Sequence, residues 1–137
     1  MAALDLGAKR IGVAYSDSGR TLASPWGMIE RSGDADRDRR AVVDAVREVE
    51  ASTVVVGLPL SLSGEVGPAA RATLDEATAL RALLEPLGVR VETADERFTT
   101  VEAERSLAAA GRRGKSARKV VDSAAAMVLL QAWLDRT

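Results

Sequence analysis

The segment at residues 4–14, Leu-Asp-Leu-Gly-Ala-Lys-Arg-Ile-Gly-Val-Ala, constrains the fold more than any other part of the chain. An apolar stretch ends at Asp5, and Gly7 follows two residues later. Apolar side chains then recur at every second position, at Ile11, Val13 and Tyr15. Such alternation is typical of a β-strand, so the segment predicts a strand, a tight turn and a second strand.

Asp5 has two interpretations at this stage. A carboxylate at such a turn is held rigidly by the hydrogen bonds of the sheet, and Gly7 has no Cβ to obstruct a phosphate or a metal ion approaching the backbone. Rigid oxygen ligands suit Mg²⁺ or Mn²⁺. Asp5 could equally close the turn by accepting hydrogen bonds from nearby backbone amides. The choice depends on whether other carboxylates can meet it.

The chain of 137 residues contains no histidine and no cysteine. This excludes Ser-His and Cys-His nucleophilic systems, a histidine general base and ordinary zinc sites, which need nitrogen or sulfur ligands. If the protein is an enzyme, carboxylates must carry the chemistry, either directly or through a hard divalent cation.

The composition predicts a single domain at 1–137 that folds alone. Hydrophobic residues make up 47% of the chain, enough for a sizeable core at this length. No apolar run approaches the ~18 residues of a membrane span, and no charged segment is followed by a long apolar one. We therefore expect no membrane association and no secretory signal, with the cytoplasm as the default location.

Hydrophobic periodicity divides the remainder of the chain into strands and helices. The predicted elements are a strand at 21–30, a helix at 36–51, a strand at 53–58, a helix at 69–87, a strand that begins at 89 and ends in Asp95-Glu96-Arg97, a short helix at 99–110 and a long helix at 116–136. The run at 53–58 is continuous and β-branched, as expected for a central strand that lies parallel to the first. The loop at 60–68 follows it, at the carboxyl end where open α/β sheets bind ligands.

Two further signals define the C-terminal third. Thr99 and Glu102 form a capping box for the short helix, and Gly111 to Gly114 mark a break. The last helix is apolar over a wide arc, so we expect it to lie against the sheet. The predicted fold class is therefore α/β, with an antiparallel three-strand meander and two parallel strands in one mixed five-stranded sheet flanked by helices.

Three acidic residues lie in apolar surroundings, where a carboxylate without a function is not expected: Asp5, Glu96 and Asp122. Two strand ends at one edge of a sheet can converge with a helix packed across it, so the three are predicted to form one site. Each also has a purely structural explanation. Glu96 and its neighbour Asp95 could set up a turn with Arg97 as partner, and Asp122 could pair with Arg118 one turn earlier.

Basic residues gather near the last acid. The window from Arg105 to Val121 carries a charge of +6, which leaves −7 for the rest of a chain whose total is −1. A local basic patch on an acidic protein can mark a polyanion site, although a solvated helix end gives the same pattern. Lys115, Arg118, Lys119 and Asp122 fall at i, i+3, i+4 and i+7 and so share one helix face. An acid flanked by cations in this way suits phosphoryl transfer.

Four motifs resemble those of the YqgF/RuvX family. They are Asp-Leu-Gly-Ala-Lys-Arg-Ile-Gly-Val-Ala-Tyr-Ser-Asp at 5–17, Val-Val-Gly-Leu-Pro-Leu at 55–60 with the loop Ser-Gly-Glu-Val-Gly-Pro at 63–68, Asp-Glu-Arg-Phe-Thr-Thr-Val-Glu-Ala at 95–103, and Lys-Val-Val-Asp-Ser-Ala-Ala-Ala at 119–126. They follow one another in order across nearly the whole chain. This is far more specific than a lone Asp-x-Gly.

The resemblance implies a fold similar to RNase H and to the RuvC resolvases. The family is described as Holliday junction resolvases and as nucleases that mature the 5′ end of pre-16S ribosomal RNA. It implies that the acids of the site are Asp5, Glu96 and Asp122, with Lys9, Arg10 and Arg97 as basic neighbours. Sites of this kind often have four acids, and Asp95 or Asp17 is the candidate for the fourth place.

The expected activity is therefore Mg²⁺- or Mn²⁺-dependent hydrolysis of phosphodiester bonds in RNA, in branched DNA, or in both. Nucleic-acid contacts are expected from the basic residues Lys9, Arg10, Arg97, Arg112, Arg113, Lys115, Arg118 and Lys119. The protein could act as a monomer or as a homodimer. Symmetric cutting of a four-way junction would call for a two-fold dimer, whereas RNA trimming would not.

Two other classes of function stay open. Asp-x-Gly before a strand also opens the actin-like ATPase and sugar kinase fold, but those proteins need two such domains closing on ATP, and this chain supplies one. A non-catalytic nucleic-acid-binding module could use the same basic face. Stacking on bases would then depend on few aromatic residues: Tyr15, Trp26, Phe98 and Trp133. Of these, Phe98 stands beside Glu96, and Trp133 is expected in the core.

Overall fold

The structure, a computed structural model, describes residues 1–61, 63–98, 105, 107 and 115–136. In chain order its elements are β1 (Ala2–Leu6), β2 (Arg10–Ser16), β3 (Ala23–Glu30), α1 (Ala35–Glu48), β4 (Thr53–Leu58), α2 (Pro68–Leu84), η1 (Glu85–Leu87), β5 (Arg90–Asp95), η2 (Glu96–Phe98), α4 (Lys115–Asp122) and α5 (Ala124–Asp135). Apart from 105 and 107, the predicted helix at 99–110 and the predicted break at 111–114 lie outside the described residues.

The five strands form one mixed sheet in the order β3-β2-β1-β4-β5. β1 pairs antiparallel with β2, and β2 pairs antiparallel with β3. β4 is parallel to both β1 and β5. This confirms the predicted fold class. Because parallel strands run in the same direction, the ends of β1 and β5 lie at the same edge of the sheet.

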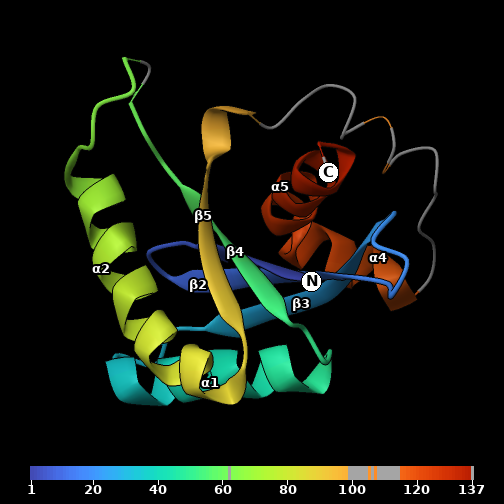
Figure 1. Ribbon diagram of the computed structural model, residues 1–137, viewed down its shortest axis with the longest axis horizontal. Helices are drawn as coiled ribbons and strands as arrows, with labels where there is room; N and C mark the ends of the chain where they lie inside the picture. The colour runs from blue at the N-terminus through green and yellow to red at the C-terminus, as the bar shows by residue number, and fades with distance from the viewer. Residues whose placement is uncertain (62, 99–104, 106, 108–114, 137) are drawn as a thin grey trace.

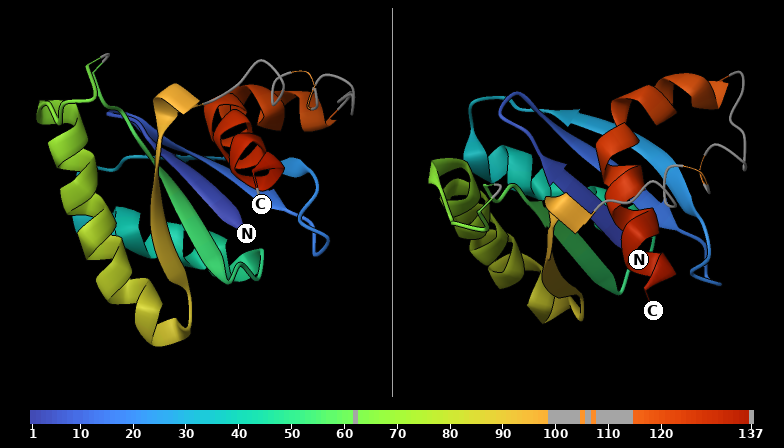
Figure 2. Two further views of the ribbon diagram at one scale, coloured as in Figure 1. Left: turned by 45° about the horizontal axis from the view of Figure 1, so that its top comes forward. Right: turned by 90° about the horizontal axis from the view of Figure 1, so that it is seen from above.

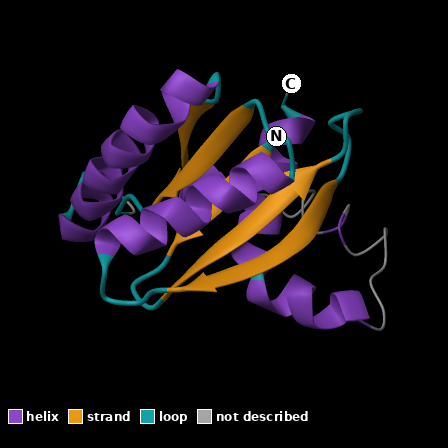
Figure 3. Ribbon diagram, turned by 90° about the horizontal axis from the view of Figure 1, so that it is seen from below, coloured by secondary structure: helices purple, strands orange, loops and turns teal. Residues whose placement is uncertain are grey.

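Helices cover both faces of the sheet (Figure 1). On one face, α1 and α2 contribute Val46 and Leu80 to a core that includes Leu4 of β1. Figure 3 shows α1 crossing the strands on this side. On the other face, α5 contributes Leu130 to a core that includes Ala3. The neighbouring residues Ala3 and Leu4 thus belong to opposite cores, as the alternation of side chains along a strand requires.

Local signals in the sequence set most of the helix ends. The Asp34 side chain caps α1 by accepting hydrogen bonds from the amides of Asp36 (3.1 Å) and Arg37 (3.2 Å). Pro68 opens α2, where its fixed φ suits the first turn. Gly88 closes η1 at a φ of +80°, a left-handed conformation that favours glycine. In the described part of the chain, every helix is too short or too polar to cross a lipid bilayer.

The C-terminal helix differs from the prediction, because it is broken at Ser123 instead of running unbroken over 116–136. α4 ends just before this residue and α5 begins just after it, in a different direction (Figure 2). The Ser123 hydroxyl donates to the carbonyl of Lys119, four residues earlier. A serine that bonds backward in this way competes with the helical backbone and bends the helix. As a result α4 packs on β3, whereas α5 packs on β1 and β2.

Gln131 of α5 forms hydrogen bonds with the backbone at the start of the edge strand β3. Its side chain is buried, and its Oε1 accepts a hydrogen bond from the Ala23 amide at 2.9 Å. Its Nε2 donates to the Thr21 carbonyl and to Asp135 Oδ1, both at 3.0 Å. One side chain thus serves both a backbone donor and a backbone acceptor at the sheet edge.

We expect Gln131→Leu to lower the free energy of unfolding by about 1–3 kcal/mol, because it keeps the volume but removes the acceptor and the donor that serve β3. Urea denaturation monitored by circular dichroism measures this difference. Asp135→Asn is the control, since an asparagine oxygen still accepts from Gln131, and its stability should stay near that of the wild type. Unchanged stability in Gln131→Leu would contradict this role.

Candidate active site

Asp5 lies in a part of the sheet surface that is bare of other side chains. It is on the α5 side of β1, two residues beyond the buried Ala3. Its register partner on β2 is Gly12. On the other side, Gly57 of β4 stands one residue beyond the last register pair of β1 and β4. Since both neighbouring strands carry glycine, this surface has room for a group from outside the sheet.

Glu96 fills that room from the end of β5. It begins η2, which lies beside α5 (Figure 2). A Cβ on Gly57 would lie only 2.7 Å from Glu96 Oε1 and 3.0 Å from its Cγ, so the Glu96 side chain rests on the Gly57 backbone. There it shares a hydrogen bond with Asp5. The structure therefore brings two of the three predicted acids together.

The surroundings of Glu96 favour its protonated form. Burial raises the pKa of Glu96 above its ordinary value, and the charge of Asp5, its hydrogen bond with Asp5 and the charge of Asp95 raise the pKa further. Two carboxylates held this close repel each other when both are ionised. Such unfavourable pairs are found mainly at functional sites, where another group relieves the repulsion.

An ion pair holds the turn that follows Asp5. The Arg31 guanidinium donates from Nε to the carbonyl of Gly7 at 2.7 Å and makes two hydrogen bonds of 3.0 Å to the Glu76 carboxylate. It thereby ties the β1–β2 turn to the end of β3 and to α2. The turn itself requires glycine, because a Cβ on Gly7 would lie 2.7 Å from the Arg10 carbonyl. Gly7 is thus needed for the backbone conformation.

Both candidates for a fourth acid have hydrogen-bond partners outside the pair. Asp95 binds Arg97, with hydrogen bonds of 2.9 Å from Nε and 2.6 Å from Nη2. These bonds hold the pKa of Asp95 below its ordinary value. Asp17 lies in the β2–β3 turn and accepts hydrogen bonds from Thr21. That turn is at the opposite end of β1 from Asp5, because β1 and β2 are antiparallel.

The main chain of Asp122 lies close to Asp5, one of the two paired acids. A Cβ on Gly12 would lie 3.4 Å from the Asp122 carbonyl oxygen and 3.7 Å from the Cβ of Asp5. The last residue of α4 therefore lies over Gly12, next to Asp5. Its half-buried side chain does not complete a cluster: among the described residues, no three acidic side chains gather closely enough to hold a metal ion. The bend at Ser123 determines this placement.

The predicted basic contacts in the described part of the chain lie in three places. Lys9 and Arg10 are exposed in and just after the turn beside Asp5, and Arg118 and Lys119 are exposed on α4. Arg97 lies against the loop before α2, with its Nη2 3.4 Å from the position of a Cβ on Gly64. Outside the described part of the chain lie Arg112 and Arg113, and also the side chains of Lys115 and Phe98.

Sequence reasoning missed three residues that shape the site. Gly57 interrupts a β-branched run, and an isolated glycine within a strand often marks a close approach by another group, so this signal was available. Arg31 and Glu76 are 45 residues apart. Their pairing leaves no local pattern in a chain that is rich in both charges.

This fold, a mixed five-stranded sheet with helices on both faces and a carboxylate near the end of its central strand, defines an α/β protein with an RNase H-like fold. It is similar to T. thermophilus RuvC in complex with a Holliday junction substrate, with a TM-score of 0.60 and 13% identity, covering 99% of this chain and 96% of that one. The yeast mitochondrial Holliday junction resolvase Ydc2 matches with a TM-score of 0.52 and 9% identity, covering 98% and 78%. At such low identities the likeness is one of fold alone.

The family model of RuvX, described as a Holliday junction resolvase, matches residues 1–136. A relative from Mycobacterium sp. (strain KMS), named "Putative pre-16S rRNA nuclease", is 46% identical over 133 residues, which cover 97% of this chain and 78% of the relative. A relative of the same name from Rhodococcus opacus (strain B4) is 45% identical over 135 residues, covering 96% and 75%. The chain belongs to the RuvX family, which confirms the resemblance found in its motifs.

Gly57→Ala should displace the Glu96 carboxylate, because the added Cβ would occupy its position. We expect nucleic-acid cleavage to fall by about 100-fold, since a misplacement of about 1 Å can cost that much. The flexible end of Glu96 can move aside, but the buried Leu129 would also lie 3.0 Å from the added Cβ, so we expect a modest fall in melting temperature without loss of the fold. Gly67→Ala is the control, because a Cβ there meets nothing within 4 Å. Wild-type cleavage by Gly57→Ala would show that the position of Glu96 is unimportant.

Glu96→Gln should raise the melting temperature at pH 7 to 8. Because the pKa of Glu96 is raised in the folded state, its ionised form lowers stability above that pKa. As the pH falls through the folded pKa toward the ordinary glutamate value, the wild type gains a proton and the advantage of the variant disappears. Thermal melts from pH 4 to 8 measure this, with the exposed Glu65→Gln as control. A variant no more stable than the wild type at pH 7.5 would contradict the repulsion.

Proposed function

We propose that the protein is a divalent-metal-dependent endonuclease that hydrolyses phosphodiester bonds in structured nucleic acid. The observation that carries this proposal is the pair of carboxylates, Asp5 and Glu96, held together at the edge of the sheet where β1 and β5 end. In the absence of histidine and cysteine, such a pair is the strongest catalytic device that the described residues offer.

The residues present fit a small divalent cation. Carboxylate oxygens are the hard ligands that Mg²⁺ and Mn²⁺ prefer, and Mg²⁺ in phosphoryl-transfer sites is commonly bound through one or two carboxylates, with waters and substrate phosphates in the other positions. A cation would also relieve the repulsion that raises the pKa of Glu96. Asp5 and Glu96 would hold it. Asp122 is the third acid of the proposal, because its main chain already lies beside Asp5.

The roles of the protein's own groups follow from their positions. When bound, the cation would supply Lewis-acid stabilisation of the charge that develops on the phosphate oxygens. The pair formed by Arg31 and Glu76 keeps the turn after Asp5 in place, so that the carboxylate needs no reorganisation. Lys9 and Arg10, exposed at the same turn, would bind the phosphates that flank the scissile bond.

For the substrate, we favour the 5′ end of pre-16S ribosomal RNA over a Holliday junction. The relatives that are 45–46% identical carry the name of a pre-16S rRNA nuclease, whereas the solved junction resolvases share only 9–14% identity with this chain. A ribosomal precursor would place the protein in the cytoplasm. Two opposed active sites, and hence a dimer, would be required only for symmetric junction cutting.

The test offers purified protein a precursor 16S RNA fragment and a synthetic four-way junction side by side, with Mg²⁺ or Mn²⁺. We expect metal-dependent cleavage, mainly of the RNA, that falls by more than roughly 100-fold in Asp5→Asn, Glu96→Gln and Asp122→Asn, because loss of a direct ligand should exceed the effect of losing a supporting contact.

Asp44→Asn, which removes an exposed carboxylate from α1, is the matched control and should cleave like the wild type. Binding without cleavage of either substrate would contradict the proposal and favour the non-catalytic binding module. Full activity in Asp122→Asn alone would remove that residue from the site and leave the pair intact.

A further inference from the structure

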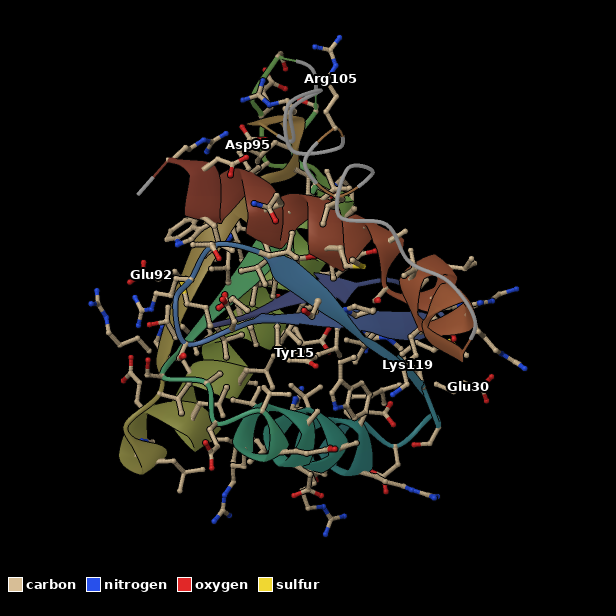
Figure 4. All side chains as sticks on the ribbon, turned by 90° about the vertical axis from the view of Figure 1, so that its right-hand side faces the viewer. Tyr15, Glu30, Glu92, Asp95, Arg105 and Lys119 are labelled. Carbon is tan, nitrogen blue, oxygen red and sulfur yellow. The ribbon has the colours of Figure 1, made fainter. Side chains whose placement is uncertain are left out.

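A hollow of about 370 Å³ opens beside the edge strand β3, on the α1 side of the sheet and so on the face opposite the acidic pair. Its walls come from β2, β3, the C-terminal end of α1 and α4. The lining residues are Tyr15, Pro25, Trp26, Glu48, Val49 and Lys119. Figure 4 looks onto this edge of the sheet and labels Tyr15 and Lys119. The volume is at the small end of the range for ligand pockets, which suits one flat ring system better than a larger ligand.

The hollow combines aromatic and apolar walls. Tyr15 and Trp26 are both half-buried, so their rings are packed at one side and accessible at the other. The Trp26 Nε1 donates to the Glu48 carboxylate at 3.2 Å, which fixes the orientation of the indole before any ligand arrives. A pre-oriented aromatic surface binds flat rings at low entropic cost.

The concentration of aromatic residues here is unusual for this chain. It has only four aromatic residues in all, and two of them line this one hollow. Trp26 and Trp133 each pack against a core, Trp26 on the α1 side and Trp133 on the α5 side, but of the two only Trp26 lines the hollow. Trp26 thus has one part of its side chain on the core and another part at the hollow.

Lys119 lies between the hollow and the acidic pair. It is exposed on α4 and lines the hollow, whereas Asp122, one turn later on the same helix, lies over Gly12 next to Asp5. The hollow is on the α1 side of the sheet and Asp5 on the α5 side, so the path between them passes around the edge strand β3, on which α4 packs. A nucleic-acid strand that follows this edge can reach both, with Lys119 placed for a phosphate between them.

We propose that this hollow binds a single unpaired nucleobase of the nucleic-acid substrate, with its ring against Trp26 and Tyr15 and its adjoining phosphate on Lys119. The proposal rests on the proposed function, because the ligand belongs to the nuclease substrate. Glu48 accepts one hydrogen bond from Trp26 and can accept another from the amino group of adenine, cytosine or guanine. Bases that carry an amino group therefore bind better than uracil.

The test measures binding of a precursor RNA fragment with single-stranded ends, in EDTA so that it is not cleaved. Trp26→Leu and Tyr15→Leu should each weaken binding by roughly 5-fold or more, as expected from the loss of one base-stacking contact. Trp133→Leu removes a tryptophan that does not line the hollow, and should bind like the wild type. Lys119→Ala should reduce the slope of log K against log salt by about 1.

A scan of single abasic positions along the RNA identifies the bound base and does not depend on the folding of any variant. One position should weaken wild-type binding by roughly 5-fold or more and have no further effect in Trp26→Leu. A flat scan, or wild-type binding by both leucine variants, overturns the proposal for the hollow. Cleavage in Mg²⁺ separates the two claims: if the wild type cleaves, the proposed nuclease function stands, and if it neither binds nor cleaves, that function fails as well.

Discussion

The close placement of the Asp5 and Glu96 carboxyl groups is the constraint that the surrounding structure meets. Asp5 and Glu96 share a hydrogen bond on a patch of sheet where both strands beside Asp5 carry glycine. A side chain at Gly57 would occupy the position of the Glu96 carboxylate. At this point the sheet surface lacks side chains on both neighbouring strands, and two acidic groups lie close together. Such locally unfavourable arrangements are typical of functional sites, where a bound ligand can offset the repulsion.

The remainder of the fold keeps the pair in position. The central strand β1 carries Asp5, and the parallel arrangement of β4 and β5 brings Glu96 to the same edge of the sheet. Arg31 and Glu76 hold the turn after Asp5 against α2, while Leu129 of α5 lies close to Gly57 on the same surface. The carboxylates thus belong to rigid elements, which suits a site that must be preorganised.

Much of this arrangement could be predicted from the sequence, and the exceptions have physical reasons. Alternation and β-branched runs predict the order of strands, and the strand at Thr53–Leu58 has the predicted bounds. Asp5 and Glu96 were predicted to meet because strand direction brings them to one edge, and the glycines beside Asp5 leave room for the Glu96 side chain. The break at Ser123 was not predicted, since a serine within an apolar helical pattern bends the helix only when its hydroxyl bonds backward. The Arg31–Glu76 pair depends on tertiary contacts that no local pattern encodes.

The central claim is that Asp5 and Glu96 together hold a divalent cation, and anomalous diffraction from crystals grown with Mn²⁺ tests it most directly. The account predicts an anomalous peak between the two carboxylates, within ligand distance of both, at Mn²⁺ concentrations that support cleavage. The peak should be absent from crystals of Asp5→Asn grown in the same way. Mn²⁺ bound elsewhere, with the Asp5–Glu96 hydrogen bond intact in an actively cleaving protein, would contradict the claim.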